Sequence, residues 1–205
     1  VIRNSFAASI QQSVMNFGIL MVQGLVNSFG PVVMAAFAVA GKIDSFAYMP
    51  VQDFGNAFST FVAQNAGAGK DDRIQKGIRS AGICTLVFCL IITTGVCLFA
   101  RELLLIFVRP SETEVLAVGV EYLRIEGAFY CLIGFLFLFY GYFRAMGKPG
   151  MSVVLTGISL GTRVALAYTL SGIPRVGVRG IWAAVPIGWF LADVAGMLAM
   201  KADRR

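Results

Sequence analysis

Polar side chains recur at helical spacing through the first 27 residues of the chain. On a helix turning about 100° per residue they fall within an arc of about 60°, whereas most other positions carry large apolar side chains. The members of this stripe are Ser5, Ser9, Gln12, Asn16, Gln23 and Asn27. Hydroxyls and amides can hydrogen-bond across one or two helix contacts, but a continuous stripe favours a helix that faces a water-filled cavity.

A second polar face occupies residues 32–66, and its members fall within an arc of about 100°. They are Lys42, Ser45, Met49, Asp53, Asn56, Thr60 and Gln64. Lys42 and Asp53 are eleven residues apart, or about 16 Å along a straight helix, so they do not pair directly. Two interpretations remain open: Lys42 neutralises an acid on another helix, or Lys42 and Asp53 face a cavity and sense cations or protons.

Glu126 lies well inside the apolar run of residues 115–143, on the same helical side as Tyr122 and Tyr130. A carboxylate in an apolar environment is costly to keep charged, which makes it a candidate proton or cation site. Neighbouring aromatic rings also suit an organic cation. The alternative is a structural ion pair with Arg163 or with Arg124.

The remaining reactive residue types indicate no enzyme and no metal site. The chain has no histidine, and its four cysteines all lie within apolar runs, where thiols usually pack as small hydrophobic groups. Gly67-Ala68-Gly69-Lys70 lacks the upstream glycine and the following Ser or Thr of a phosphate-binding loop, and it follows a helix. We therefore expect neither catalysis nor a cofactor.

The elements that must position these residues are long apolar segments. Of the 205 residues, 58% are hydrophobic and 14% are charged, against roughly 25% charged in a soluble domain. Runs of about 20 apolar residues predict transmembrane helices and are too long for barrel strands. We predict an all-α, polytopic membrane protein with six spans, at residues 5–29, 32–66, 78–99, 115–143, 151–171 and 180–200. Pro50 should kink the second span, and Gly157 and Gly161 indicate close packing of the fifth.

The distribution of Lys and Arg predicts an orientation. With the N-terminus in the cytoplasm, the inner side carries ten basic residues and the outer loops carry four. The inner set is Arg3, Lys70, Arg73, Lys76, Arg79, Arg144, Lys148, Lys201, Arg204 and Arg205; the outer set is Arg101, Arg109, Arg175 and Arg179. We therefore expect both termini on the cytoplasmic side of the cell inner or plasma membrane. These loops account for the net charge of +6, so no nucleic-acid partner is expected.

Two stretches resemble a known family. Residues 49–70 end in Gln64-Asn65-Ala66-Gly67-Ala68-Gly69 and a basic loop, which is similar to the eighth-helix signature of multidrug and toxic compound extrusion (MATE) transporters. Residues 143–149, which include Arg144, resemble the end of the tenth helix in that family. The spacing of the segments fits helices seven to twelve, so the resemblance maps residues 1–205 onto the C-terminal six-helix lobe of a twelve-helix fold.

The resemblance implies two lobes around a central cavity, alternating access, and export of organic cations or drugs in exchange for protons or sodium. Its expected partners are membrane lipid, the missing N-terminal six-helix lobe and small organic cation substrates. The pathway residues that we expect are Gln12, Asn16, Gln23, Asn27, Lys42, Asp53, Asn56, Glu126 and Tyr130.

This chain departs from the family pattern at two places. Gln11 and Gln12 stand where many members carry an acid in the seventh helix, and Cys131 to Gly134 stand where others carry one in the tenth. The resemblance therefore favours the branch whose coupling acid lies in the first helix, outside this sequence. Two alternatives to antiport remain: a lipid-linked oligosaccharide flippase of related fold, whose cavity would be rich in Arg and Lys, and a non-transporting membrane scaffold subunit.

The stripe on the first helix provides a direct test of the transport hypothesis. Replacing Asn16 and Asn27 together by Leu should abolish efflux by the complete protein, because the pathway wall would lose amide groups at two depths. The measurement is gradient-driven export of a cationic dye from vesicles. Normal export by the double variant would leave the stripe with a packing role only.

Overall fold

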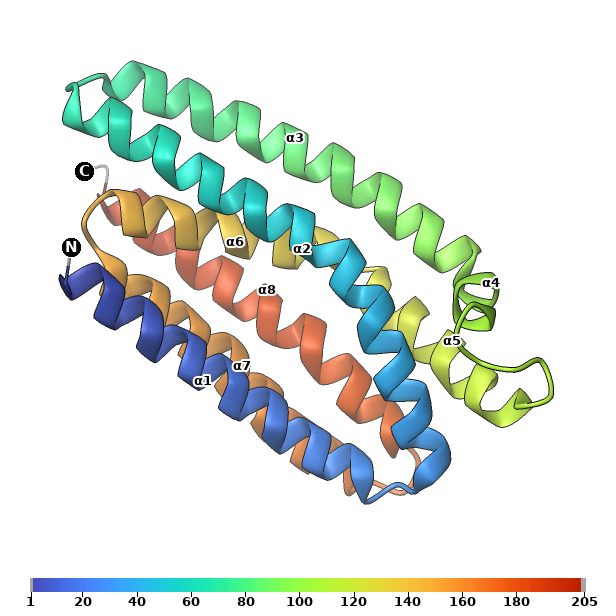
Figure 1. Cartoon of the computed structure of the whole chain (residues 1–205). Coiled ribbons are helices and arrows are strands. Elements are labelled where there is room, and N and C mark those ends of the chain that lie inside the picture. Colours follow the sequence, from blue (N-terminus) through green and yellow to red (C-terminus); the bar gives the residue numbers. More distant parts are fainter. Residues whose placement is uncertain (1, 204–205) are drawn as a thin grey trace.

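The computed structural model describes residues 2–203 and, among these, every side chain except those of residues 2–5, 7 and 8. The described residues form eight helices and no strand. They are α1 (Ile2–Asn27), α2 (Pro31–Gly67), α3 (Asp71–Leu98), α4 (Ala100–Leu105), α5 (Thr113–Gly127), α6 (Tyr130–Ala145), α7 (Pro149–Ser171) and α8 (Val178–Asp203). The predicted all-α fold is confirmed, and Figure 1 shows the long helices as one elongated bundle.

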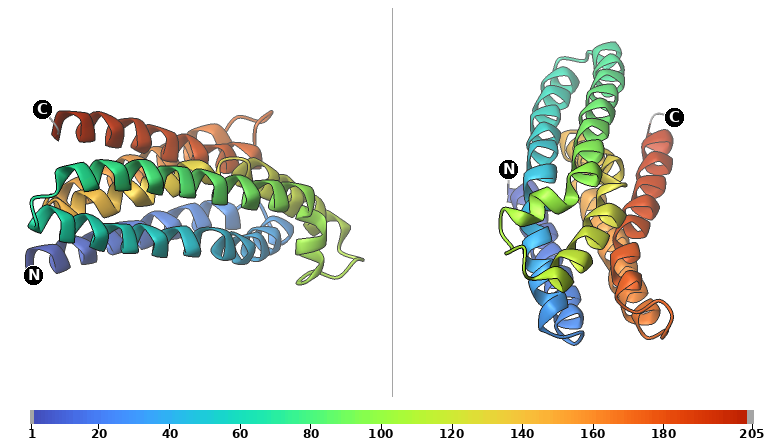
Figure 2. Two further views of the ribbon diagram at one scale, coloured as in Figure 1. Left: turned by 90° about the horizontal axis from the view of Figure 1, so that it is seen from above. Right: turned by 90° about the vertical axis from the view of Figure 1, so that its right-hand side faces the viewer.

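The helices pack as two layers that meet along the bundle. α7 packs against α1 and α8, whereas α2 packs against α5 and α6, and α3 lies along α2 and α6. Both views in Figure 2 show the C-terminal part of α2 and α3 running side by side. α1 begins and α8 ends at the same end of the bundle, where α2 also turns into α3 and α6 into α7 (Figure 1). We call this the terminal end.

Four helices are long and apolar enough to cross a membrane, namely α2, α3, α7 and α8. α5 and α6 pass the same test together but are bent by 50° at the break between them, so they count as a fifth if they form one span. α1 is not in this set, because the glutamines and asparagines of its stripe lower the hydropathy of every long window. It nevertheless belongs to the bundle through its packing on α7.

Two helices differ from the predicted apolar segments. α3 begins at Asp71 rather than at residue 78, because its first turns are charged and a search for apolar runs does not detect them. The predicted span 115–143 is not one helix but two, interrupted after Gly127. The carbonyl of Gly127 accepts a hydrogen bond from the Thr93 hydroxyl of α3 at 2.8 Å, so the break leaves this backbone group satisfied.

The run that resembles the family signature is the C-terminus of α2. Gly69 has a φ of 65°, and the Lys70 N–H donates to the Asn65 carbonyl at 2.9 Å. α6 ends in the same way, with Gly147 at a φ of 73° and the Lys148 N–H donating to a carbonyl five residues upstream at 2.8 Å. Only glycine adopts this left-handed conformation at little cost, so both motifs stop a helix and set the following turn.

Close packing at glycine residues is found between α2 and α6, whereas the sequence predicted it for α7. Gly157 and Gly161 are exposed, and no atom of the described residues lies within 4 Å of the place a Cβ would take, so the predicted close contact is not found within this chain. A Cβ added at Gly141 would instead lie 2.5 Å from the carbonyl oxygen of Gly55, and one at Gly55 would lie 2.8 Å from that of Phe137. These glycines let α2 and α6 approach at the level of their backbones.

Replacing Gly141 by Ala should therefore lower the stability of the purified protein by about 1–3 kcal/mol, because the methyl group forces two backbones apart. The melting temperature in detergent measures the effect. Gly157→Ala is the matched control, since its methyl group would enter open space, and it should leave the melting temperature unchanged or slightly raised. Equal melting temperatures of the two variants would contradict the assigned contact.

Candidate functional site

A pair of buried carboxylates lies in the half of the bundle away from the terminal end. Asp44 of α2 and Glu126 of α5 are each 5% exposed. Asp44 accepts a hydrogen bond from the Tyr122 hydroxyl of α5 at 2.6 Å and another, on its second oxygen, from the Tyr130 hydroxyl of α6. One carboxylate thus joins α2 to both halves of the broken span.

Arg163 of α7 is the cation of this cluster. It lies close enough to Asp44 and to Glu126 for a favourable electrostatic interaction with each. The predicted alternative of a direct Glu126–Arg163 ion pair is not seen: the ion pairs among the described residues are Lys148–Asp203 and Arg179–Glu121. Glu126 Oε2 and Arg163 Nε are both buried without a hydrogen-bond partner. Arg124, the other predicted partner of Glu126, is exposed.

Aromatic rings enclose the carboxylate pair on one side. Trp182 of α8 is fully buried, stacks on Phe37 with ring centroids 5.6 Å apart, and meets Tyr122 edge to face at 4.8 Å. The Trp182 indole N–H has no hydrogen-bond partner. These rings exclude water from the side of the cluster that they cover, which strengthens the electrostatic interactions within it.

A polar seam on α7 leads from the terminal end to Arg163. Its members repeat at intervals of three and four residues, and the first three are buried: Ser152, Thr156, Ser159 and Arg163. Opposite the seam, α8 contributes the buried carboxylate of Asp193, whose Oδ1 has no hydrogen-bond partner. Ser152, Thr156 and Ser159 were not among the predicted site residues.

Asp44 is a buried member of this cluster that was not among the predicted site residues. It is two residues from Lys42 and therefore lies off the polar face of α2. It shares its own face with buried Ala36, Ala40 and Ala47. A single acid on a helix face of small apolar residues was the available signal, because small residues indicate the face on which neighbouring helices come closest.

The predicted pathway residues are placed differently from one another. Glu126 and Tyr130 belong to the buried cluster, as described above. The exposed members are Gln12, Asn16, Gln23 and Asn27 on α1 and Lys42, Asp53 and Asn56 on α2. The Ser5 and Arg3 side chains, and residues 204 and 205, lie outside the described part of the structure. The stripes therefore form an outer surface of this bundle and do not reach the carboxylate pair.

Local contacts of the exposed polar residues are few. The Gln12 amide donates to Asn16 at 3.1 Å, and Arg144 Nη2 donates to Asn56 at 2.8 Å. The Lys42 ammonium lies 5.6 Å from the centre of the Phe107 ring and makes no direct ion pair within the described residues. The interpretation in which Lys42 neutralises an acid on another helix is therefore not supported.

Removing one donor from Asp44 should destabilise the bundle. Tyr130→Phe deletes a hydrogen bond to a buried charge, which is worth about 1.5–3 kcal/mol, so the melting temperature should fall. Tyr168→Phe is the control, because Tyr168 is exposed on α7 and its hydroxyl makes only a 3.4 Å contact with the Met21 carbonyl. If Tyr130→Phe is as stable as the control, then the hydrogen bond to Asp44 does not contribute to the stability of the bundle.

Comparison with known proteins identifies the family. The sequence matches the MatE family over residues 6–169. It is 26% identical over 204 residues to the probable multidrug resistance protein YpnP of Bacillus subtilis (strain 168). This alignment covers 100% of this chain and 45% of the relative. It is also 26% identical over 187 residues to the probable multidrug resistance protein YoeA of the same organism, covering 91% and 40%. The chain thus spans less than half the length of these curated relatives.

The fold agrees with this match. The structure superimposes on that of an outward-facing multidrug resistance MATE family transporter of the MOP superfamily with a TM-score of 0.91 and 19% sequence identity, over 99% of this chain and 45% of that one. With a family match over most of its length and the fold of a MATE transporter, the chain belongs to the MatE family.

Proposed function

We propose that this chain is the C-terminal six-helix lobe of a cation-coupled antiporter that exports organic cations and drugs. The proposal is supported by the multidrug resistance relatives and by the coverage of less than half their length. The observation that carries it is the pair of buried carboxylates, Asp44 and Glu126, with the half-buried Arg163 beside them. α2 and α7, which carry Asp44 and Arg163, are long and apolar enough to cross a membrane, and α5, which carries Glu126, is so only together with α6.

The charges of the cluster support cation coupling. Two ionised carboxylates and one guanidinium leave one negative charge uncompensated, and an unpaired charge in this environment costs several kcal/mol. Uptake of one proton or one monovalent cation removes that cost. Asp44 already receives two tyrosine hydroxyls, which favour its ionised form, whereas Glu126 keeps an oxygen without a partner. Glu126 is therefore the group that binds the incoming cation.

A proton fits this cluster better than sodium. A hard metal cation needs several oxygen ligands, and both oxygens of Asp44 are engaged by tyrosine hydroxyls. A proton needs a single oxygen, and Glu126 Oε2 supplies it. The resemblance led us to expect the coupling acid outside this sequence; the buried pair supports a coupling site within this lobe instead. In this proposal no cofactor takes part.

The same cluster can link cation binding to movement. It connects α2, α5 and α6 through Asp44, and it reaches α7 through Arg163. Neutralising Glu126 weakens its attraction to Arg163 and so changes the balance of forces between α7 and the other three helices. In this proposal the substrate binds between the N-terminal lobe and the exposed polar faces of α1 and α2. During alternating access, the change in forces would move these polar faces relative to the N-terminal lobe.

The alternatives are less well supported. A flippase for anionic lipid-linked sugars would need several basic side chains on its cavity wall, whereas Lys42 is the one basic residue among the predicted pathway positions. A scaffold subunit has no need of a buried carboxylate with an oxygen that lacks a hydrogen-bond partner, since an apolar residue would pack there at lower cost.

Neutral variants of the two carboxylates test the proposal. In proteoliposomes that contain the complete transporter, Glu126→Gln should reduce proton-driven export of a cationic dye at least about tenfold, because it removes the group that exchanges the proton. Asp44→Asn should do the same. Glu114→Gln, at an exposed position at the start of α5, should export at the normal rate.

Two further measurements separate the outcomes. Equilibrium dye binding should persist in Glu126→Gln, because the dye does not contact this buried residue. If a sodium gradient drives export by the wild-type protein and this export is lost in Glu126→Gln, then the coupling ion is sodium and not a proton. Normal proton-driven export by Glu126→Gln would overturn the proposed coupling site.

A further inference from the structure

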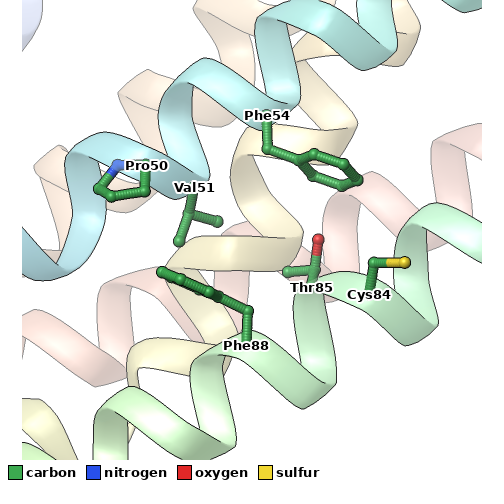
Figure 3. A pocket seen from close by; sticks show the side chains of 6 residues that line it. All are labelled: Pro50, Val51, Phe54, Cys84, Thr85 and Phe88. Carbon is green, nitrogen blue, oxygen red and sulfur yellow. The ribbon is translucent and has the colours of Figure 1, made fainter.

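A groove runs between α2 and α3, and none of its lining residues belongs to the carboxylate cluster. Its deeper part is a cavity of about 260 Å³ lined by Pro50, Val51 and Phe54 of α2 and by Cys84, Thr85 and Phe88 of α3. Figure 3 shows the side chains of the two helices facing each other across it. A second cavity, of about 510 Å³, continues toward the terminal end. Phe54 and Cys84 line both cavities, so the two form one groove.

The groove has the length of one half of a bilayer. It extends along α3 from Arg73 to Phe88, which is about 22 Å of helix axis at 1.5 Å per residue. The hydrocarbon core of a bilayer is about 30 Å thick, so one leaflet with its headgroups spans a comparable distance.

The groove is apolar along its length and cationic at one end. Phenylalanines 54, 58 and 61 of α2 form one wall. Arg73 and Lys76, one helical turn apart on α3, line the part nearest the terminal end, and both are exposed. The two positive charges disfavour an organic cation at this place. They suit an anionic group attached to a long apolar chain.

The surface beside the groove supports a lipid as the occupant. α3 presents a continuous set of large apolar side chains to the outside of the bundle: Ile83, Leu86, Val87, Leu90 and Ile91. Such a surface on a helix able to span a membrane is covered by lipid acyl chains. An acyl chain in the groove would continue that layer.

We propose that the α2–α3 groove is a binding site for an anionic phospholipid. Arg73 and Lys76 hold the headgroup phosphate, and one acyl chain lies along the phenylalanines of α2 toward Phe88. The phospholipid also keeps α2 and α3 packed at the terminal end, where Gly77 faces the ring of Phe61. This inference does not rest on the proposed transport function and is tested by binding alone.

The test uses native mass spectrometry of the complete transporter with phosphatidylglycerol or phosphatidylcholine of identical acyl chains. Wild-type protein should retain phosphatidylglycerol preferentially. Arg73→Gln combined with Lys76→Gln should weaken its retention about 25-fold, or roughly fivefold for each basic residue lost. The control, Arg101→Gln with Arg109→Gln, removes the same charge from exposed positions outside the groove and should retain the lipid normally.

Two charge-neutral variants test the apolar part. Cys84→Trp would fill the junction of the two cavities and should block phosphatidylglycerol retention without changing the charge of the headgroup site. Ala57→Trp, at an exposed position on the groove wall, provides a second blocking variant if Cys84→Trp does not fold. In wild-type protein, bound phosphatidylglycerol should also slow alkylation of the exposed Cys84 thiol.

The outcomes decide the proposal. Equal retention of the two lipids by wild-type protein, or normal phosphatidylglycerol retention by the Arg73 and Lys76 double variant, would overturn it. Retention lost in the basic double variant but normal in both tryptophan variants would likewise reject the groove, since it would mean that the lipid binds at the headgroup end only.

Discussion

The packing of this lobe depends on one carboxylate that is held where water cannot reach it. Asp44 brings a charge into the contact between α2, α5 and α6, and the hydroxyls of Tyr122 and Tyr130 compensate it. Because an uncompensated charge at this depth is costly, these donors must stay in register with α2. That requirement fixes the broken span against α2, and through Arg163 it extends to α7.

Buried polar groups determine which helices pair with one another in this bundle, and small residues allow those helices to approach closely. Alanines line the face of α2 that carries Asp44, and Gly55 meets Gly141 nearer the terminal end. In a membrane, apolar side chains gain little by leaving lipid for protein, so packing at short range and buried hydrogen bonds must supply the stability. Both kinds of contact occur on α2: the buried hydrogen bonds at Asp44, and the close backbone packing at Gly55, nearer the terminal end.

Much of the fold could be predicted from the sequence. Long apolar runs identified most spans, and the run ending in Gly69 and the run around Arg144 indicated the family. The charged start of α3 and the break after Gly127 escaped prediction, because hydropathy does not detect a helix outside the membrane or an interruption without proline. Glu126 was selected as a candidate from its apolar setting, and Tyr130 from its position on the same helical side. Asp44 was not, because its partners are 78 and 86 residues away in the chain, and no local pattern brings them together.

The interruption between α5 and α6 has an electrostatic consequence for the two acids. Peptide dipoles give a helix a partial positive charge at its start and a partial negative charge at its end. Glu126 lies in the last turn of α5, and Tyr130, which donates to Asp44, is the first residue of α6. One tyrosine that donates to Asp44 thus begins one half-helix, whereas Glu126 lies in the last turn of the other. The broken span thus gives two chemically similar carboxylates different surroundings: Glu126 lies at the partly negative end of α5, and Asp44 is held by tyrosine hydroxyls from both half-helices.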